Sequence, residues 1–523
     1  MRPLASLVPL LPAAIAAAAA FAARLPFVIS AKIPFDSDEA VEGLMARHVL
    51  GGELPAFLWG QAFKGVPEVY AAAGAFALFG SSVATLKLTT LLLFAMYAGA
   101  HFVLLDRLSS RWIAVASTLL LIFSPPALVF WSLDASAEFV VIMFLGTALL
   151  LVALDDPKGG GSNVRPPNFA VGLIAGLGLW VHALFVIYLI PLAVIAGRQH
   201  RFWTVLAQRR PNAVTFIIGS VAAVYLVLAL FAFFTGGFTV QSGRLAISAT
   251  APQKLLRIAA AAMAVSVATH LALRSARGAL ARRYWPAAAG FLVGFSPALL
   301  YSVLVEPARS PARSADVFQL ASAWPDMAGN IVPIIAGFKI ATTERLAIPW
   351  IAALPGAAAV GAYLWFHRGR LTSDFFALFV VFVPFLFLAS GVYLDTQSYR
   401  YLVPWYAGLA VAWAAGSLAL SRGNRLAAAA VTAAIIGTHI WQQLLWYEKL
   451  QPDRASMATI ECLRNRGIRG GFGDYWTAYK LTFLADERII IAPVNGVDRY
   501  PAYTAFVRGL PPHERMDDVA QCN

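Results

Sequence analysis

The chain has 523 residues, of which 59% are hydrophobic and 13% are charged, and its mean hydropathy is +0.70. Soluble globular proteins carry about 25% charged residues, so the composition excludes a soluble protein and predicts an α-helical protein that crosses a membrane many times. The net charge of +13 does not indicate a nucleic-acid partner, because the lysines and arginines fall in short loops between apolar segments, where they set orientation.

Apolar segments long enough to span a bilayer recur along the chain. A spanning helix needs roughly 20 apolar residues, and this criterion predicts about 13 spans, with the segment 168–197 taken as two short helices. The first span is too long for the roughly 7–15-residue core of a cleaved signal peptide. The predicted spans are 4–30, 83–105, 112–130, 136–154, 168–181, 183–197, 213–234, 255–274, 286–304, 347–366, 375–393, 401–420 and 425–445.

Positive charges gather in every second loop between these spans. They include Arg107 and Arg111; Lys158 and Arg165; Arg198, Arg201, Arg209 and Arg210; Arg274, Arg277, Arg282 and Arg283; Arg368 and Arg370; and Arg422 and Arg425. Cytoplasmic loops carry such an excess, so we predict a multi-pass protein of a bacterial-type inner membrane with its N-terminus in the cytoplasm. An odd number of spans then places the C-terminus in the periplasm.

Three regions are expected on the periplasmic side. The loop 31–82 contains two amphipathic stretches, 39–51 and 67–79, a second loop covers 305–346, and the tail begins at 447. The tail has soluble composition, and its pattern predicts a helix at 455–464, a strand at 470–475, a helix at 477–484 and a strand at 488–492. We therefore divide the chain into a membrane domain, 1–446, and a small periplasmic α/β domain, 447–523. The chain has no GxxxxGK[ST] phosphate loop, which argues against direct use of ATP.

Three acids, Asp36, Asp38 and Glu39, follow the first span at once. Charges beside a bilayer need water, a partner or a ligand. One interpretation is that Asp36, Ser37 or Asp38 only caps the helix that begins near Glu39. Another is that Asp36 and Asp38 hold a divalent cation such as Mg²⁺ or Mn²⁺ through their oxygens. We predict that no metal or other cofactor is required and keep the cation at these two residues as the alternative.

The first outer loop resembles that of a known class of membrane enzymes. The residues concerned are Asp38 to Leu50, Gly52-Glu53-Leu54-Pro55, Gly60 to Tyr70, and Ala77-Leu78-Phe79-Gly80. They resemble the first periplasmic loop of GT-C glycosyltransferases, most of all the protein O-mannosyltransferase-like branch that includes the lipid A aminoarabinose transferase. The segment Tyr399 to Tyr406 resembles the Arg-Tyr-Leu-x-Pro sequence that opens a late span in these enzymes. The resemblance implies transfer of a sugar from a polyprenyl-phosphate donor to a glycolipid, polysaccharide or protein acceptor at the periplasmic face.

The resemblance also implies roles for individual residues. Asp38 is the predicted base, with Glu39 second, because a carboxylate near the scissile bond can accept the acceptor's proton. Glu138 matches a second acidic position, although it could be a solvated acid at the membrane interface. Lys64 and Arg400 are predicted to bind the donor phosphate, with snorkelling to the interface as the alternative for Arg400. The weaker candidates in the same region are Gln61, Glu68, Tyr70 and Tyr399.

A transporter or lipid flippase is the main alternative class, and a non-catalytic scaffold for the tail is another. A transporter would share the spans and a cavity of lipid size. Against it, most of the acids cluster in one outer loop, and the paired interrupted helices that are typical of transporters have no counterpart in the sequence.

The chain contains two cysteines, Cys462 and Cys522, and both lie in the tail. The periplasm is oxidising, so we expect them to form a disulfide. The alternative is two unrelated thiols.

The orientation can be tested by labelling. A cysteine introduced at Gly60 or in the tail should react with a membrane-impermeant reagent added from outside, whereas one introduced at Gly160 should not, because the positive charges place that loop in the cytoplasm. The opposite labelling pattern would contradict both the orientation and the position of the loop 31–82.

Overall fold

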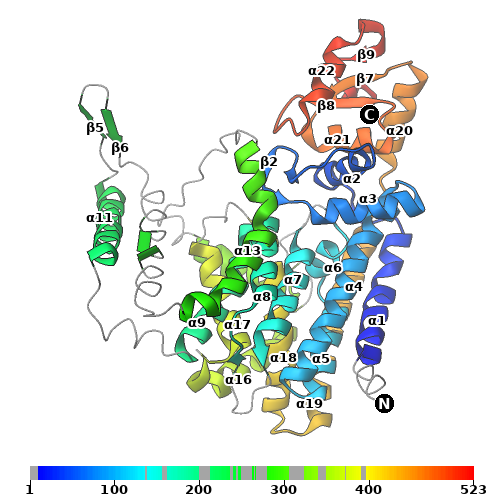
Figure 1. The fold of residues 1–523 in the computed structure, drawn as a ribbon. Coiled ribbons are helices and arrows are strands. Elements are labelled where there is room, and N and C mark those ends of the chain that lie inside the picture. Colours follow the sequence, from blue (N-terminus) through cyan, green and yellow to red (C-terminus); the bar gives the residue numbers. More distant parts are fainter. Residues whose placement is uncertain are drawn as a thin grey trace, which may run out of the picture.

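The computed structural model describes residues 10–135, 138–155, 162–199, 213–235, 239–242, 245–248, 279–304, 323–339, 349–371, 373–389 and 396–522, with a few positions between 259 and 266. It is a mostly helical bundle with a small parallel sheet near the C-terminus (Figure 1). The start of α1 (Leu10–Ile29) and the C-terminal tail lie at opposite ends of this bundle.

Most of the predicted spans correspond to helices. Within the described residues, 3 helices are long and apolar enough to cross a membrane, or up to 4 if a bent pair is one span, and other apolar helices are shorter. The predicted span 255–274 and the predicted loop 305–346 lie largely outside the described residues. The helices that match predicted spans are α1, α4 (Val83–Leu108), α7 (Phe139–Ala153), α8 (Phe169–Val181), α9 (Val186–Gln199), α11 (Ala213–Thr235), α13 (Ala279–Leu304), α16 (Leu354–His367), α17 (Phe375–Ala389), α18 (Tyr406–Leu420) and α19 (Arg425–Lys449).

The predicted span 112–130 is not a continuous helix. It is divided into α5 (Arg111–Ile122) and α6 (Pro126–Trp131), because Pro125 and Pro126 lack the N–H groups that a helix needs and the residue before a proline avoids helical geometry. The break leaves carbonyl groups at the end of α5. Arg24 of α1 donates to two of them, the oxygens of Leu121 and Ile122, each at 2.9 Å. A buried arginine thus provides hydrogen-bond donors to carbonyl groups at the end of α5.

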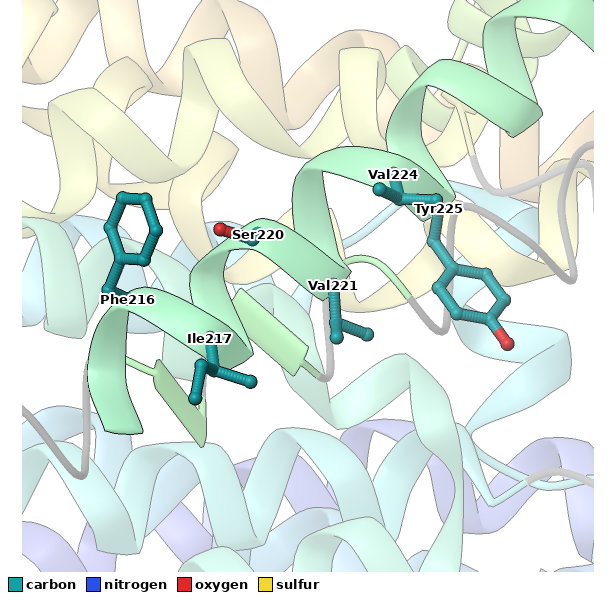
Figure 2. Close-up of a pocket in the computed structure, with 6 residues that line it drawn as sticks. All are labelled: Phe216, Ile217, Ser220, Val221, Val224 and Tyr225. Atoms are coloured by element: carbon teal, nitrogen blue, oxygen red, sulfur yellow. The ribbon is translucent and has the colours of Figure 1, made fainter. Parts of the chain in front are cut away.

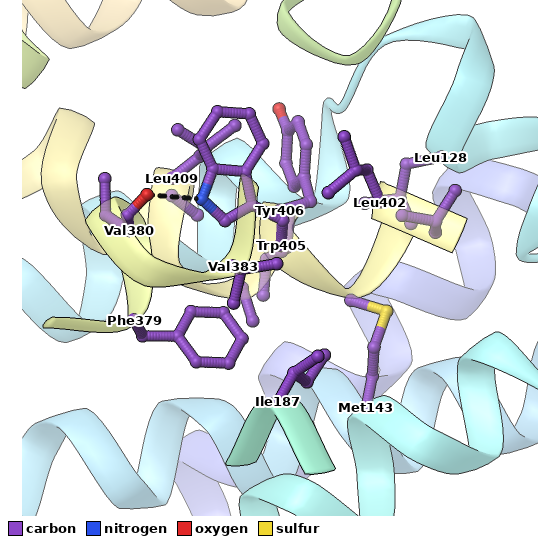
Figure 3. Close-up of a cluster of buried hydrophobic side chains, with 14 of the residues drawn as sticks. Leu128, Met143, Ile187, Phe379, Val380, Val383, Leu402, Trp405, Tyr406 and Leu409 are labelled. Atoms are coloured by element: carbon purple, nitrogen blue, oxygen red, sulfur yellow. Dashed lines mark hydrogen bonds between the residues drawn. The ribbon is translucent and has the colours of Figure 1, made fainter. Parts of the chain in front are cut away.

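The core of the bundle forms around η5 (Thr396–Trp405), where this segment meets α6, α7, α17 and α18. Leu128, Met143, Phe379, Leu402 and Trp405 are among the buried side chains that pack there (Figure 3). The indole N–H of Trp405 donates to the carbonyl oxygen of Val380 at 2.9 Å, so this large side chain is buried with its polar atom paired.

Helices α8 and α13 approach each other closely through glycines. A Cβ at Gly172 or Gly176 would stand 1.8 or 2.3 Å from a backbone oxygen of α13, and one at Gly290 or Gly294 would stand 2.1 or 2.2 Å from one of α8. Each helix therefore presents two glycines four residues apart to the other, which is the small-residue spacing that lets helices pack tightly in membranes.

The first outer loop forms two helices and a hairpin. Helix α2 (Ser37–Leu50) and helix α3 (Pro67–Phe79) lie across the end of the bundle (Figure 1). Their residue ranges agree with the two predicted amphipathic stretches, 39–51 and 67–79. Strands β1 (Phe57–Leu58) and β2 (Gln61–Gly65) pair antiparallel between them.

The tail is a compact α/β unit. Its sheet has the order β8-β7-β9, with β7 (Gly470–Gly473) parallel to both β8 (Ile490–Pro493) and β9 (Arg515–Met516). Helices α20 (Arg454–Asn465) and α21 (Tyr475–Leu484) match the predicted pattern, and α22 (Pro501–Gly509) follows β8. Cys462 and Cys522 form a disulfide in this unit, with their Cα atoms 5.8 Å apart.

The tail is docked on α2 by apolar and charged contacts. The ring of Phe483 packs against Gly43 of α2. Arg47 of α2 forms an ion pair with Asp486 at 3.0 Å. The rings of Trp59 and Tyr500 stack with their centroids 4.1 Å apart, so the outer loop and the tail share one interface.

Replacement of Gly43 by alanine should loosen this docking. The added Cβ would stand 2.5 Å from Cε2 of the buried Phe483 ring, and overpacking of this kind costs about 1–3 kcal/mol. Gly74→Ala in α3 is the matched control, because the described residues leave open space around its added methyl and alanine favours a helix by up to about 1 kcal/mol. Thermal melting and limited proteolysis of the tail in detergent measure the difference. Equal behaviour of the two variants would contradict the tight contact.

Candidate active site

Most of the predicted site residues gather where α2, the β1–β2 hairpin, the start of α7 and the tail meet. Seven acids take part, and they differ in burial and in partners. They are Asp36, Asp38, Glu39, Glu42, Glu68, Asp134 and Glu138. Glu39, Glu42, Glu68, Asp134 and Glu138 are buried, whereas Asp36 and Asp38 are part-exposed.

Asp36 is the residue that caps α2. Its Oδ1 accepts from the backbone N–H of Glu39 at 3.0 Å, which satisfies one of the free donors at the start of the helix. Burial, together with the nearby charge of Asp134, raises the pKa of Asp36 to about 7. Since the cap is provided by Asp36, Asp38 is not needed for that purpose.

Asp38 lies in the first turn of α2 and faces the tail. The hydroxyl of Tyr475 donates to its Oδ1, and Nη2 of Arg499 lies 3.3 Å from the same oxygen. The Asp38 side chain is 29% exposed. It is therefore a carboxylate that a solvent-borne or membrane-borne molecule can reach while two tail residues hold it.

Glu39 is fully buried and tied to the membrane helix α4. Its Oε2 lies 2.7 Å from Nζ of Lys87, and its Oε1 accepts from the N–H of Ala135 at 3.4 Å. Burial raises the pKa of Glu39 to about 8, and Lys87 opposes that rise. Both oxygens have partners inside the protein, so this geometry suits a residue that anchors α2.

Glu138 and Lys64 form a second buried ion pair. Nζ of Lys64 lies 2.7 Å from Oε2 of Glu138, and Nε2 of His182 lies 3.6 Å from Oε1. Burial would raise the pKa of Glu138, but the charges of Lys64 and His182 outweigh burial and lower it. Glu138 is thus a buried, ionised group rather than a solvated acid at the interface.

Glu42 and Glu68 lie beside this pair, around a cavity of about 10 Å³. Within the described part of the chain, Oε2 of each has no hydrogen-bond partner, while Oε1 of Glu68 accepts from Thr90. Burial is the main cause that raises the pKa of both groups well above the usual value. A cavity of this size has room for about one water, so the surroundings of these two acids offer little solvation to a charged carboxylate.

The remaining predicted residues have defined positions. Arg400, in η5 (Thr396–Trp405), is half-buried, and its charge interacts with those of Asp38 and Glu138. Lys64 also interacts electrostatically with Asp38, so Asp38 interacts with the charges of Lys64 and Arg400 in addition to that of Arg499. The Tyr70 hydroxyl donates to the carbonyl oxygen of Pro55 at 2.9 Å, and the Tyr399 hydroxyl accepts from the Trp131 indole at 3.1 Å. Those two tyrosines therefore have structural partners.

No metal centre is formed by the described residues, since no three His, Cys, Asp or Glu side chains among them meet in a way that could hold a metal ion. A larger hollow of about 450 Å³ lies elsewhere, on α11. Figure 2 shows that apolar side chains such as Phe216, Ile217 and Val221 line it, with Ser220 and the Tyr225 hydroxyl. Its lining has no charged group, so it is not a second candidate for the chemistry.

Four partners of the acids, Lys87, His182, Tyr475 and Arg499, were not predicted from the sequence. Lys87 had a detectable signal, because a lysine within an apolar helix is costly unless it is paired. His182 lies between the two predicted spans 168–181 and 183–197, where a lone histidine gives no specific signal. Arg499 gave no local signal, since 461 positions separate it from Asp38.

The chain is structurally similar to two GT-C glycosyltransferases. The Archaeoglobus fulgidus oligosaccharyltransferase, solved with zinc and sulfate, is 14% identical with a TM-score of 0.48, over 92% of this chain and 62% of that one. The same archaeal enzyme, AglB, solved with an inhibitory peptide and a dolichol-phosphate, gives 13% identity and 0.46, over 88% and 60%. ArnT from Cupriavidus metallidurans, in the apo state, gives 13% and 0.45, over 96% and 89%. This chain thus spans about three fifths of the length of the archaeal enzyme.

No protein-family model matches the chain, and no curated protein matches it.

Removal of Lys64 should destabilise the protein through Glu138. Lys64→Met leaves a buried carboxylate without its cation, and breaking a buried ion pair costs about 3–5 kcal/mol. The double variant Lys64→Met/Glu138→Gln should recover most of that loss, because no unpaired charge remains. Melting temperatures in detergent measure both effects.

The same pair predicts a pH dependence. Because the folded protein lowers the pKa of Glu138, its contribution to stability is present above about pH 4.3, the usual carboxyl value, and is lost as the pH falls through the lowered pKa. In the comparison of variants described above, a double variant whose melting temperature is as low as that of Lys64→Met would contradict this account of the Lys64–Glu138 pair.

Proposed function

We propose that the protein is a GT-C-type glycosyltransferase that moves a sugar from a polyprenyl-phosphate donor to a lipid, polysaccharide or protein acceptor at the periplasmic face of the inner membrane. The observation that carries the proposal is the contrast between Asp38 and the other acids. Asp36 caps a helix, Glu39 and Glu138 are paired with lysines, and Asp38 remains part-exposed with cations around it. The resemblance of the loop 31–82 to that of GT-C enzymes supports the same assignment.

The chemistry assigns one role to each group. The acceptor oxygen or nitrogen attacks the anomeric carbon while the Asp38 carboxylate takes its proton, and the bond from that carbon to the lipid phosphate breaks. Negative charge grows on the leaving phosphate, and a nearby cation stabilises it. Arg400 is the preferred phosphate ligand, because a guanidinium can bind phosphate through two parallel hydrogen bonds. Lys64 is the less suitable phosphate ligand, because its ammonium group is already paired with Glu138.

The proposal includes the arrangement in the membrane. It retains about 13 spans, a cytoplasmic N-terminus, a membrane domain 1–446 and a periplasmic domain 447–523. The position of α1's start and the tail at opposite ends of the bundle supports opposite sides for the two termini. Asp38 and Glu39 are kept as first and second candidates for the base, and Glu39 is the weaker of the two because Lys87 holds it.

The base role can be tested with the full-length protein in lipid vesicles. We expect release of polyprenyl phosphate from at least one member of a panel of labelled polyprenyl-phosphate sugars when lipid, polysaccharide or protein acceptors are supplied. Asp38→Asn should lower turnover by about 10²–10⁴, the usual effect of losing a general base, because the amide keeps the volume and loses the basicity. Asp517→Asn is the control, since Asp517 is an exposed tail residue whose side chain is 81% accessible.

The outcomes separate the alternatives. Near-normal turnover of Asp38→Asn, with normal insertion and melting, would remove Asp38 from the base role. Movement of the labelled lipid across the vesicle without loss of its sugar would instead favour a flippase.

A further inference from the structure

The tail supplies two side chains to the candidate base. Tyr475 is the first residue of α21, and Arg499 lies in the connection between β8 and α22. Nε of Arg499 donates to the Tyr475 hydroxyl at 2.9 Å, and that hydroxyl donates to Oδ1 of Asp38. Nη2 of Arg499 also lies 3.3 Å from Oδ1. The three groups therefore form a closed network around one oxygen.

Arg499 is itself fixed from the opposite side. With the Gln61 amide oriented so that its oxygen faces the guanidinium, that oxygen accepts from Nη1 at 2.6 Å and from Nη2 at 2.8 Å. The Arg499 side chain is 7% exposed, so little of it is available to solvent. A buried arginine that is held by a neutral amide and directed at one carboxylate is suited to orient that carboxylate.

Tyr475 has a fixed direction of donation. Burial and the charge of Asp38 raise the pKa of Tyr475, so the hydroxyl stays protonated and donates to the carboxylate. The hydrogen bond from Arg499 polarises that hydroxyl and strengthens its donation, since bonds in a chain reinforce one another. Tyr475 and Arg499 thus hold the Asp38 carboxylate together.

We propose that Tyr475 and Arg499 are positioning residues for Asp38, and that the active site is incomplete without the tail. They bind Oδ1 and so present Oδ2 as the oxygen that takes the acceptor's proton. This inference rests on the proposed function and deepens it. The tail is then part of the catalytic unit, and its docking on α2 sets the position of the base.

The test uses full-length protein in vesicles with the polyprenyl-phosphate sugar that wild type turns over. Arg499→Ala should lower kcat at least tenfold while the donor KM changes less than threefold, because orientation of the base is lost and donor binding is kept. Arg499→Lys should recover part of kcat, since an ammonium can still reach a carboxylate. Arg508→Ala is the matched control, because Arg508 is an exposed arginine of α22 in the same tail.

Tyr475→Phe separates positioning from folding, because it keeps the ring and removes only the hydroxyl. A several-fold loss of kcat with an unchanged melting temperature and an unchanged proteolysis pattern of the tail would support the inference. Unchanged kcat in both Arg499→Ala and Tyr475→Phe would overturn it. A rise in donor KM with kcat preserved would also overturn it, since Arg499 would then be a donor ligand. Failure of wild type on every donor would count against the proposed function instead.

Discussion

The hydrogen-bonded contact between Lys87 and Glu39 is the one on which the geometry of the site depends. Lys87 belongs to the membrane helix α4, and its Nζ binds Oε2 of Glu39 at 2.7 Å and the carbonyl oxygen of Pro34 at 3.0 Å. One lysine therefore fixes the segment before α2 and the first turn of that helix. Asp38 stands between those two attachment points, so its position follows from a charge in the adjacent membrane helix. A buried charge without this partner would cost several kcal/mol.

Similar carboxyl groups serve different purposes here because their surroundings differ. Burial raises the pKa of Glu42 and Glu68 well above the usual value, whereas Lys64 beside the equally buried Glu138 lowers the pKa of that carboxyl. Asp38 combines partial exposure with contacts from Tyr475 and Arg499. Most members of the acid cluster are thus buried beside a lysine or a second acid, and in the proposed function the part-exposed Asp38 is the carboxylate that reacts.

Local pattern predicted much of the fold. Apolar runs marked the helices of the bundle, and α2, α3, α20 and α21 begin and end within a few residues of the predicted segments. The segment 112–130 forms two helices instead of one because the Pro125-Pro126 pair interrupts it, which a criterion of length and hydropathy does not detect. Strand β9 and helix α22 are short and lack a strong period, so they were missed. The loop acids were found from their position in the sequence, but the partners that give each acid its role, such as Arg499 for Asp38, are brought there by tertiary packing alone.

The disulfide has a consequence for the site as well as for the tail. Cys462 and Cys522 are 60 residues apart, and the segment they close contains both Tyr475 and Arg499. Closure of a loop of this length removes about 4 kcal/mol of chain entropy from the unfolded tail in the simplest treatment. The bond therefore stabilises the unit that carries the two side chains in contact with Asp38. Under the proposed function, chemistry at Asp38 is in this way linked to the folding of the tail, since Asp38 comes from the N-terminal part of the chain and Tyr475 and Arg499 come from the C-terminal part.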